Sequence, residues 1–281
     1  MRNLLSAGFA RLWRSKAFYL SLGALFLLAV FIMLNFSRQA MADTSGYSFY
    51  LEHHYFDTAV YSGIFIAAFI GIFISVDYSD GTLRNKLIIG HTRTAVYLSH
   101  LIICAAASVI FTVTWVVGGM VGIPVLGLWA IPADQLFLVA VVSVLASISL
   151  SAIFLSVCIL SANKAVTAVT CILLSLALIV IASFFGNNLA EPEMTHGMTI
   201  TMENGLQVMD PTPNPNYVTE PLRTVYIAII NILPTGQQML LANLKSGLNF
   251  AVYPLQIAGS LLLTVLCTGA GLFLFRRKDL K

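Results

Sequence analysis

The hydrophobic positions of this chain are gathered into long uninterrupted blocks instead of alternating with polar positions. Six blocks are long enough to cross the ~30 Å hydrocarbon core of a bilayer as helices; they cover residues 17–36, 58–76, 95–120, 135–160, 165–185 and 252–275. They contain no Asp, Glu, Lys or Arg, and His100 is their one ionisable side chain besides Cys and Tyr. We therefore predict an all-α integral membrane protein, with residues 1–281 forming a single transmembrane domain of six helices.

Composition supports a membrane environment and excludes other classes of protein. Hydrophobic residues make up 58% of the 281 positions, charged residues 10%, and the mean hydropathy is +0.88, whereas soluble domains contain about 25% charged residues. The formal net charge of +3 is too small to indicate a nucleic-acid partner. The four cysteines fall within the apolar blocks without metal-ligand spacing, which favours buried small hydrophobic residues over a metal site.

The basic residues indicate on which side of the membrane each connection lies. Cytoplasmic loops of membrane proteins carry an excess of Lys and Arg. Twelve of the fifteen Lys and Arg residues lie in the N-terminal segment, after the second block, after the fourth block and at the C-terminus, whereas the other connections hold Arg38, Arg223 and Lys245. We therefore predict a multi-pass protein of the plasma (cytoplasmic) membrane with both termini in the cytoplasm, which six spans satisfy.

Residues 3–16, before the first block, have a basic amphipathic pattern. Four apolar residues share one helix face and two arginines lie off it: Leu5, Phe9, Leu12 and Trp13, with Arg11 and Arg14. This favours an interfacial helix on the inner leaflet, and a plain basic flank of the first span is the alternative. The region also imitates a secretory signal with a cleavage site at Ala40-Met41-Ala42. Its apolar stretch of about twenty residues exceeds the roughly 7–15 of a signal, which favours a retained helix.

The connection between the second and third blocks has the clearest helix signals among the predicted cytoplasmic segments. Ser79 and Asp80 are good N-cap residues, and Gly90 is placed to end the helix in a left-handed conformation. Leu83 and Leu87 stand one turn apart on one face. The pattern predicts a helix of about two and a half turns, which needs a partner surface because helices so short are marginal in water. A polar connector is the alternative.

This segment, residues 77–93, resembles a motif of the membrane permease subunits of ABC-2 type transporters. In that family the second span is followed by an acidic residue, a short spacer, Gly-Thr, a basic or polar residue that is often Asn, a Leu, and a Gly with Arg three positions later. The matching positions are Asp77, Gly81, Thr82, Arg84, Asn85, Leu87, Gly90 and Arg93. The segment contains no Glu, so a family role assigned to a glutamate has no matching residue in it.

Weaker similarities extend the resemblance along the chain. The basic helix before the first span is similar to the family's elbow helix. The stretch Ile232–Gln237 resembles the Pro-Gly turn of the family's outer re-entrant hairpin, and Phe275–Leu280 resembles its basic, Asp-containing tail. The resemblance therefore implies a fold with an elbow helix, a cytoplasmic coupling helix between spans two and three, and an outer hairpin between spans five and six.

The resemblance also implies a function, that of the permease subunit of an ATP-driven exporter. The family assembles two permease chains, identical or different, with two cytoplasmic ABC ATPase chains. This sequence lacks a Gly-x-x-x-x-Gly-Lys-Ser/Thr phosphate loop and, apart from His100, ionisable relay groups in its spans. ATP and Mg would therefore be used by the partner ATPase, and this chain would bind no cofactor and would not be an enzyme.

In this interpretation the segment docks into a cleft of the ATPase as a coupling helix. Leu83 and Leu87 would be the apolar anchors. The polar rim would consist of Arg84, Lys86 and Arg93, and Asp77 and Asp80 would orient the segment by capping. The predicted ATPase-coupling residues are Asp77, Asp80, Gly81, Thr82, Leu83, Arg84, Asn85, Lys86, Leu87, Gly90 and Arg93.

The long connection 186–250 lies on the predicted outer side. Its first part is polar and rich in proline, which indicates an extracellular loop. Residues 222–245 regain apolar character on both sides of a predicted turn, Pro234, Thr235, Gly236 and Gln237. We expect two short helices in a re-entrant hairpin that dips into the outer leaflet. One interfacial amphipathic helix is the alternative.

Other functions find less support in the sequence. Glu52-His53-His54 with Asp57 lacks a further metal ligand, and adjacent histidines do not share a helix face. Neither an HExxH motif nor an intramembrane carboxylate pair is present, which argues against a membrane protease. The main rival is a non-transporting membrane immunity or sensor protein that sequesters an antimicrobial peptide. The apolar spans weakly favour a hydrophobic or amphipathic cargo, and the cargo itself stays open.

Overall fold

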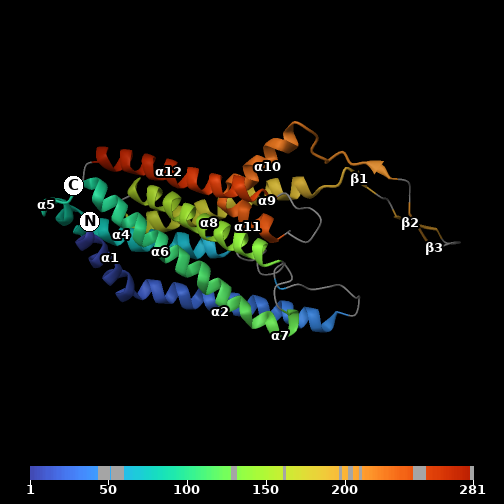
Figure 1. Ribbon diagram of the computed structural model, residues 1–281, viewed down its shortest axis with the longest axis horizontal. Coiled ribbons are helices and arrows are strands. Elements are labelled where there is room, and N and C mark those ends of the chain that lie inside the picture. Colours follow the sequence, from blue (N-terminus) through green and yellow to red (C-terminus); the bar gives the residue numbers. More distant parts are fainter. Residues whose placement is uncertain are drawn as a thin grey trace.

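The computed structural model describes residues 1–43, 51, 60–127, 132–160, 163–195, 198–201, 205–208, 211–242 and 251–278. Long helices run side by side in a bundle (Figure 1): α2 (Lys16–Ala42), α4 (Ser62–Ser79), α6 (Arg93–Gly119), α8 (Ala133–Leu160), α9 (Lys164–Ala190) and α12 (Tyr253–Arg277). The shorter helices are α1 (Arg2–Arg14), α5 (Thr82–Ile88), η1 (Met120–Gly122), α7 (Ile123–Leu126), α10 (Leu222–Ile232) and α11 (Pro234–Ala242).

The two ends of the bundle differ in what they carry. Both chain ends lie with α1 and α5 at one end of the molecule, which we call the termini end (Figure 1). The bent pair α10 and α11 lies toward the opposite end, which we call the hairpin end (Figure 1).

Each of the six predicted apolar blocks corresponds to one of the long helices. Within the described residues, five helical stretches are long and apolar enough to cross a membrane by themselves: α2, α6 continued through α7, α8, α9 and α12. Two further pairs qualify only when taken together, α4 with α5, bent by 55°, and α10 with α11, bent by 99°. The chain is therefore a helical membrane protein with five to seven candidate spans. The count of six remains a prediction.

Four of the predicted spans end later than the hydrophobic pattern suggested, the fifth at Ala190 of α9 instead of residue 185 and the sixth at Arg277 of α12 instead of residue 275. The first was expected to end at residue 36, but α2 continues to Ala42 and so includes Arg38. The second was expected to end at residue 76, but α4 continues to Ser79. Asp77 therefore lies within this helix and not in the connection after it. A helix can continue past an apolar block because its backbone hydrogen bonds do not depend on the polarity of the side chains. A charged side chain that is buried there, as Asp77 is, needs hydrogen-bonding or charged partners.

Helix α4 lies at the centre of the packing, in contact with α2, α6, α8 and α9. Three buried phenylalanines from three helices meet there: the ring centroids of Phe18 and Phe69 are 5.4 Å apart, and that of Phe111 lies within 6 Å of both. Gly71 allows α4 to approach α9 closely, since a Cβ at this position would lie 2.8 Å from the Ala168 Cα. Such close packing takes the place of a hydrophobic driving force between helices in lipid.

The predicted N-terminal helix is present as α1, and one of its faces packs on the bundle. Leu4 and Leu12 are its buried residues, and Gly8 lies against the Ile103 side chain of α6. Trp13, which belongs to the apolar stripe expected to lie on the inner leaflet, is 52% exposed. The amphipathic pattern identified the helix, but the face that α6 covers did not follow from it.

The predicted polar outer loop contains short β-ladders, which the all-α prediction did not include. Strand β1 (Met194–Thr195) pairs antiparallel with β4 (Thr212–Pro213), with Met194 opposite Pro213. Strand β2 (Met198–Thr201) pairs antiparallel with β3 (Gly205–Val208), with Met198 opposite Val208. These strands extend away from the helical bundle (Figure 1).

The predicted pair of short helices is present as α10 and α11, but the break falls earlier than expected. The chain turns at Leu233, which is extended, and α11 begins at Pro234. Proline suits a first helical turn because the missing N–H would be unpaired there. The residues 234–237 thus form the start of the second helix and not the turn itself. A Cβ at Gly236 would collide with the Ile230 carbonyl oxygen, so only glycine permits this bend.

Hydrogen bonds from buried amide side chains connect the bend between α10 and α11 to α12. The Gln237 amide nitrogen donates to the carbonyl oxygens of Asn231, at 2.9 Å, and of Gln256, at 3.0 Å. Its amide oxygen accepts from the Ser260 hydroxyl at 2.9 Å. We call Asn231, Gln237, Gln256 and Ser260 the Gln237 network, and all four residues are buried. The network joins α10, α11 and α12 at the hairpin end.

Candidate functional site

The chain leaves α4 and enters α5 at the termini end through a tight bend. Gly81 occupies the N-cap position of α5 with φ of +68°, in the left-handed region that favours glycine. The N-cap residue of this helix is therefore Gly81, and not Ser79 or Asp80 as predicted. Asp80 instead receives a hydrogen bond from Lys164 at the start of α9, with 3.3 Å between Lys Nζ and Asp Oδ1.

The other end of α5 follows the prediction for Gly90. Its φ is +99°, the Gly90 N–H bonds to the Leu87 carbonyl at 3.0 Å, and the His91 N–H bonds to the Lys86 carbonyl at 3.2 Å. This pair of bonds is a Schellman motif, which satisfies carbonyls that the last turn would leave free. The helix has seven residues, somewhat shorter than predicted.

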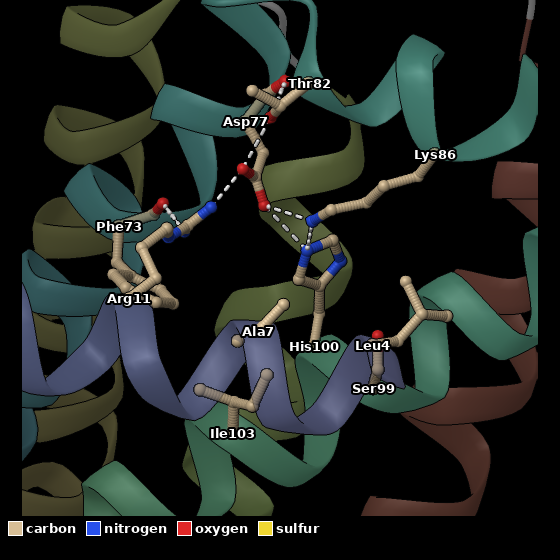
Figure 2. Close-up of a pocket in the computed structure, with 11 residues that line it drawn as sticks. Leu4, Ala7, Arg11, Phe73, Asp77, Thr82, Lys86, Ser99, His100 and Ile103 are labelled. Carbon is tan, nitrogen blue, oxygen red and sulfur yellow. Dashed lines mark hydrogen bonds and ion pairs between the residues drawn. The ribbon is translucent and has the colours of Figure 1, made fainter. Parts of the chain in front are cut away.

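Asp77 is the centre of a buried cluster at this end, which we call the Asp77 cluster (Figure 2). Its members come from four helices: Arg11 of α1, Asp77 of α4, Thr82 and Lys86 of α5, and His100 of α6. The Asp77 side chain is only 3% exposed. The four other side chains converge on its carboxylate from different sides (Figure 2).

Each carboxylate oxygen of Asp77 has two donors. Oδ1 accepts from the Arg11 guanidinium and from the Thr82 hydroxyl, the latter at 2.7 Å. Oδ2 accepts from His100 Nε2 at 2.7 Å and from Lys86 Nζ at 3.2 Å. Arg11 also donates to the Phe73 carbonyl at 2.6 Å. Burial of a carboxylate without partners would destabilise the fold by several kcal/mol. The bonds to Asp77 remove this cost only when all four helices are in place, so the cluster holds the helices together.

The cluster borders a cavity between α1, α4 and α6. Its volume is about 180 Å³, and apolar side chains of α1, α4 and α6 complete its lining around Arg11, Asp77, Lys86 and His100. With a neutral histidine, the two cations and one carboxylate leave a formal charge of +1. The side chains of Arg11 and Lys86 remain 32% and 27% exposed, so the cluster borders the surface on the side of its cations.

The predicted apolar anchors of the coupling helix face the bundle. Leu83 is 3% exposed and belongs to the hydrophobic core, and Leu87 packs against that core. Leu83 is therefore unavailable as an anchor for a partner, and Leu87 is only partly exposed, which corrects that part of the prediction. The exposed apolar side chains are the next two along the chain, Ile88 at 72% and Ile89 at 78%.

Two of the three predicted rim cations also bind within the chain, which corrects the prediction of a polar rim. Lys86 points into the Asp77 cluster. Arg93 donates through Nη1 to the carbonyl oxygens of Phe275, at 2.7 Å, and Lys278, at 2.6 Å. It therefore caps the C-terminus of α12, where carbonyls lack partners and a positive charge is favourable. Arg84 is exposed, as is Asn85.

The structure thus ties the 77–93 segment to the rest of the bundle at three points. Asp77 connects it to α1 and α6, Asp80 connects it to α9, and Arg93 connects it to α12. The predicted residues of the segment do lie together, but most of their interactions are with other helices of the same chain and not with solvent-exposed surface. Sequence reasoning missed Arg11 and the partner of His100. His100 had one signal, because it is the ionisable residue inside an otherwise uncharged block.

Among the described residues, no three or more His, Cys, Asp or Glu side chains form a group that could hold a metal ion. The Glu52-His53-His54 stretch with Asp57 lies outside the described residues. Among the cysteines, Cys158 and Cys171 lie close together as free thiols, with 3.7 Å between their sulfur atoms.

Comparison with known proteins gives one match. Residues 4–188, more than half of the chain, match the family model described as ABC-2 family transporter protein. No match was found among curated proteins or among solved structures.

Proposed function

We propose, from the premise that this chain belongs to the ABC-2 transporter family, that it is the membrane permease subunit of an ATP-driven exporter. The termini end would face the cytoplasm, in keeping with the excess of Lys and Arg there. A separate ABC ATPase subunit would dock on α5 and would use the ATP and Mg. Two permease chains, identical or different, would enclose the path of the substrate.

The single observation that supports this function best is the way α5 is mounted. Its inner face is fixed to the bundle by Leu83 and by the Asp77 cluster, while Ile88 and Ile89 are exposed at its end. Large apolar side chains that lie next to one another and are exposed on a surface are typical anchors in protein interfaces, where they fill a pocket of the partner. The exposed Arg84 beside them suits a pocket with an acidic rim.

The three connections of the segment give a route by which an ATPase could move the spans. A force on Ile88 and Ile89 would act on the short helix α5, and Lys86 and Thr82 would pass it to Asp77 of α4. From there Arg11 reaches α1 and His100 reaches α6, while Arg93 reaches the end of α12. Coupling between distant sites is generally carried by packed helices and ion-pair networks that can adopt two discrete arrangements.

The experiment that tests this function measures how an ABC ATPase from the same source binds the permease. The permease would be co-expressed with that ATPase, purified in detergent, and compared with the variant Ile88→Asp/Ile89→Asp. We expect the ATPase to co-purify with the parent chain and its binding to fall more than about tenfold in the variant, because each buried anchor contributes about 2 kcal/mol. The matched control Ile88→Val/Ile89→Val keeps apolar anchors and should retain the ATPase.

The same experiment separates the rival function. A membrane protein that only sequesters a peptide needs no ATPase, so the parent chain, the Asp variant and the Val variant would behave alike. Equal recovery of the ATPase with all three chains, at equal yield of monodisperse permease, would contradict docking through α5.

A further inference from the structure

His100 is the member of the Asp77 cluster whose charge can change near neutral pH. It lies near the start of α6 and is 5% exposed, with 2.7 Å between its Nε2 and Asp77 Oδ2. So short a contact needs a hydrogen between the two atoms, so Nε2 donates to the carboxylate. The other ring nitrogen, Nδ1, has no hydrogen-bond partner among the described residues. It can therefore accept a second proton, as histidine ordinarily does in mildly acidic water.

Lys86 stands beside the same ring nitrogen (Figure 2). Its ammonium lies 3.3 Å from His100 Nε2 and donates to Asp77 Oδ2 at 3.2 Å. Because Nε2 already carries a hydrogen, the ammonium can bond to the carboxylate but not to the histidine. A proton on Nδ1 would therefore place a full positive charge on the ring directly beside this ammonium. Like charges at such a distance repel strongly where water is scarce.

The other groups around His100 do not offset this added charge. Asp77 of α4 is the acid of the cluster, and Arg11 of α1 already binds its other oxygen. Cys104, one turn further along α6, is a buried free thiol. Helices α2, α8 and α12 also pack on α6, but in the described part of the chain none of their charged side chains contacts His100. Protonation would thus raise the formal charge of the cluster from +1 to +2.

Lys86 is the cation that is held least firmly. Arg11 also donates to the Phe73 carbonyl at 2.6 Å, and its guanidinium carbon lies 3.8 Å from the centre of the Phe73 ring. His100 is fixed in a long helix. Lys86, by contrast, belongs to the seven-residue helix α5, and its side chain is 27% exposed. Its flexible stem can carry the ammonium into water without moving a long helix.

We infer that protonation of His100 displaces Lys86 from Asp77 and loosens α5, so that the Asp77 cluster is a pH-sensitive switch. The proton would enter through the cavity of about 180 Å³, which His100 lines together with the partly exposed side chains of Lys86 and Arg11. At higher pH the ring is neutral, and Lys86 holds α5 against α4.

The two ends of α5 respond differently. Its first turn stays attached in both states, because the Thr82 hydroxyl donates to the other oxygen of Asp77 and Leu83 is buried in the core. Lys86 lies one turn later, just before the exposed Ile88 and Ile89. Loss of its contact therefore gives freedom to the end of the helix that carries these two side chains.

The permease alone tests this inference, so its failure would leave docking of an ATPase untouched. A nitroxide would be attached to Asn85→Cys, an exposed position of α5, and its mobility would be measured by electron paramagnetic resonance in nanodiscs. We expect the mobile fraction to rise at least about threefold, and reversibly, as the pH falls from about 8 to about 5. The chain without the introduced cysteine, labelled in the same way, gives the background from the native thiols.

Three substitutions assign the response. His100→Gln keeps a donor for Asp77 but takes up no proton, so the label should stay immobile at both pH values. Lys86→Gln removes the charged contact itself, so the label should be mobile at both. The matched control is His91→Gln, because His91 directly follows the end of α5 and is also a histidine. This control should keep the full response of the parent chain.

A second label tests which cation leaves. Ala10→Cys carries it on the exposed side of α1, next to Arg11, and it should not respond to pH because Arg11 keeps its bonds. Equal responses at positions 10 and 85 would overturn the inference, since acid would then loosen this whole end of the molecule.

Other outcomes also contradict the switch. A parent chain with the same spectrum at both pH values would overturn it, as would a response that persists in His100→Gln or disappears in His91→Gln. If His100→Gln does not fold, Lys86→Gln decides, since that side chain is partly exposed. A response in Lys86→Gln equal to that of the parent chain would show that displacement of Lys86 is not its cause.

Discussion

The Asp77 cluster at the termini end and the Gln237 network at the hairpin end both join several helices through buried polar groups, but they do so with different chemistry. The Asp77 cluster depends on charges, and two of its cations, Arg11 and Lys86, remain partly exposed. The Gln237 network is neutral, fully buried and bonded mainly to backbone carbonyls. A charged joint at a surface can rearrange when its partners move into water, whereas a neutral joint in an apolar environment has no such alternative.

The comparison leads to a hypothesis about which end of the protein moves. We infer that the termini end is an adjustable joint, through which a partner can act on several helices, and that the hairpin end is a fixed corner. The following substitutions would break or sharpen this difference, from the largest expected effect to the smallest.

The largest effect is expected for Asp77→Asn. The substitution keeps the size of the side chain but leaves Arg11 and Lys86 without their counter-charge, and breaking a buried ion pair from one side costs about 3–5 kcal/mol. Partial exposure of the cations places our expectation at the lower end, about 3 kcal/mol. Thermal unfolding in detergent measures it.

The matched control is Asp80→Asn, because Asp80 pairs with Lys164 and both side chains are about half exposed. Exposed pairs contribute about 0–1 kcal/mol, so this variant should unfold nearly like the parent chain. Equal destabilisation by the two substitutions would mean that the burial of Asp77 has no special consequence.

A somewhat smaller loss, about 2–3 kcal/mol, is expected for Gln237→Ala, since it removes the acceptor of the Ser260 hydroxyl and the amide donor to the buried carbonyls of Asn231 and Gln256. The control Gln39→Ala removes the same amide from an exposed position on α2 and should change the stability by less than about 0.5 kcal/mol. Chemical unfolding of both variants measures the difference, and a neutral Gln237→Ala would show that the network does not hold the bend.

The bend itself is tested by Gly236→Ala. The new Cβ would collide with the Ile230 carbonyl oxygen, and such crowding costs about 1–3 kcal/mol. Gly269→Ala is the control, because a Cβ at Gly269 meets nothing within 4 Å and alanine improves helix propensity by up to about 1 kcal/mol. Comparison of their melting temperatures should place the two variants on opposite sides of the parent chain. A stable Gly236→Ala variant would show that the corner is not fixed.

The smallest effect concerns salt and separates the two chemistries directly. The difference in unfolding free energy between the parent chain and Asp77→Asn should be smaller at high salt than at low salt, by less than about 1 kcal/mol. The reason is that salt screens the partly exposed charges of Arg11 and Lys86. The difference between the parent chain and Gln237→Ala should stay constant, since the groups involved are neutral. Unfolding curves at several salt concentrations measure both, and a parallel response would remove the distinction.

The sequence predicted the helices well because their signal is local. Blocks of apolar residues mark the spans whatever they pack against, and Gly90 marks the end of α5 because few other residues adopt its conformation. Each apolar block therefore forms a helix, although several of the helices end later than expected, and Gly90 ends α5 as predicted.

The sequence did not predict the contacts within the candidate site, because they join residues far apart. Arg11 and Asp77 are separated by 66 positions, and Arg93 and Phe275 by 182. The stripe of Leu83 and Leu87 showed that α5 has an apolar face, but not that the bundle itself covers this face. The exposed pair Ile88 and Ile89 follows from that orientation and could not be identified before it.

The measurement that tests the central claim most directly is the environment of α5 during binding of the ATPase. A polarity-sensitive fluorophore would be attached to an Ile89→Cys variant in nanodiscs. A Thr219→Cys variant, exposed in the segment predicted to lie outside, would be the control. The native thiols Cys104, Cys158 and Cys171 are buried, and Cys267 is half-buried in α12, so the introduced thiols should react first. The account predicts a blue shift at position 89 alone when the ABC ATPase binds. Binding of the ATPase with no change at position 89 would contradict it.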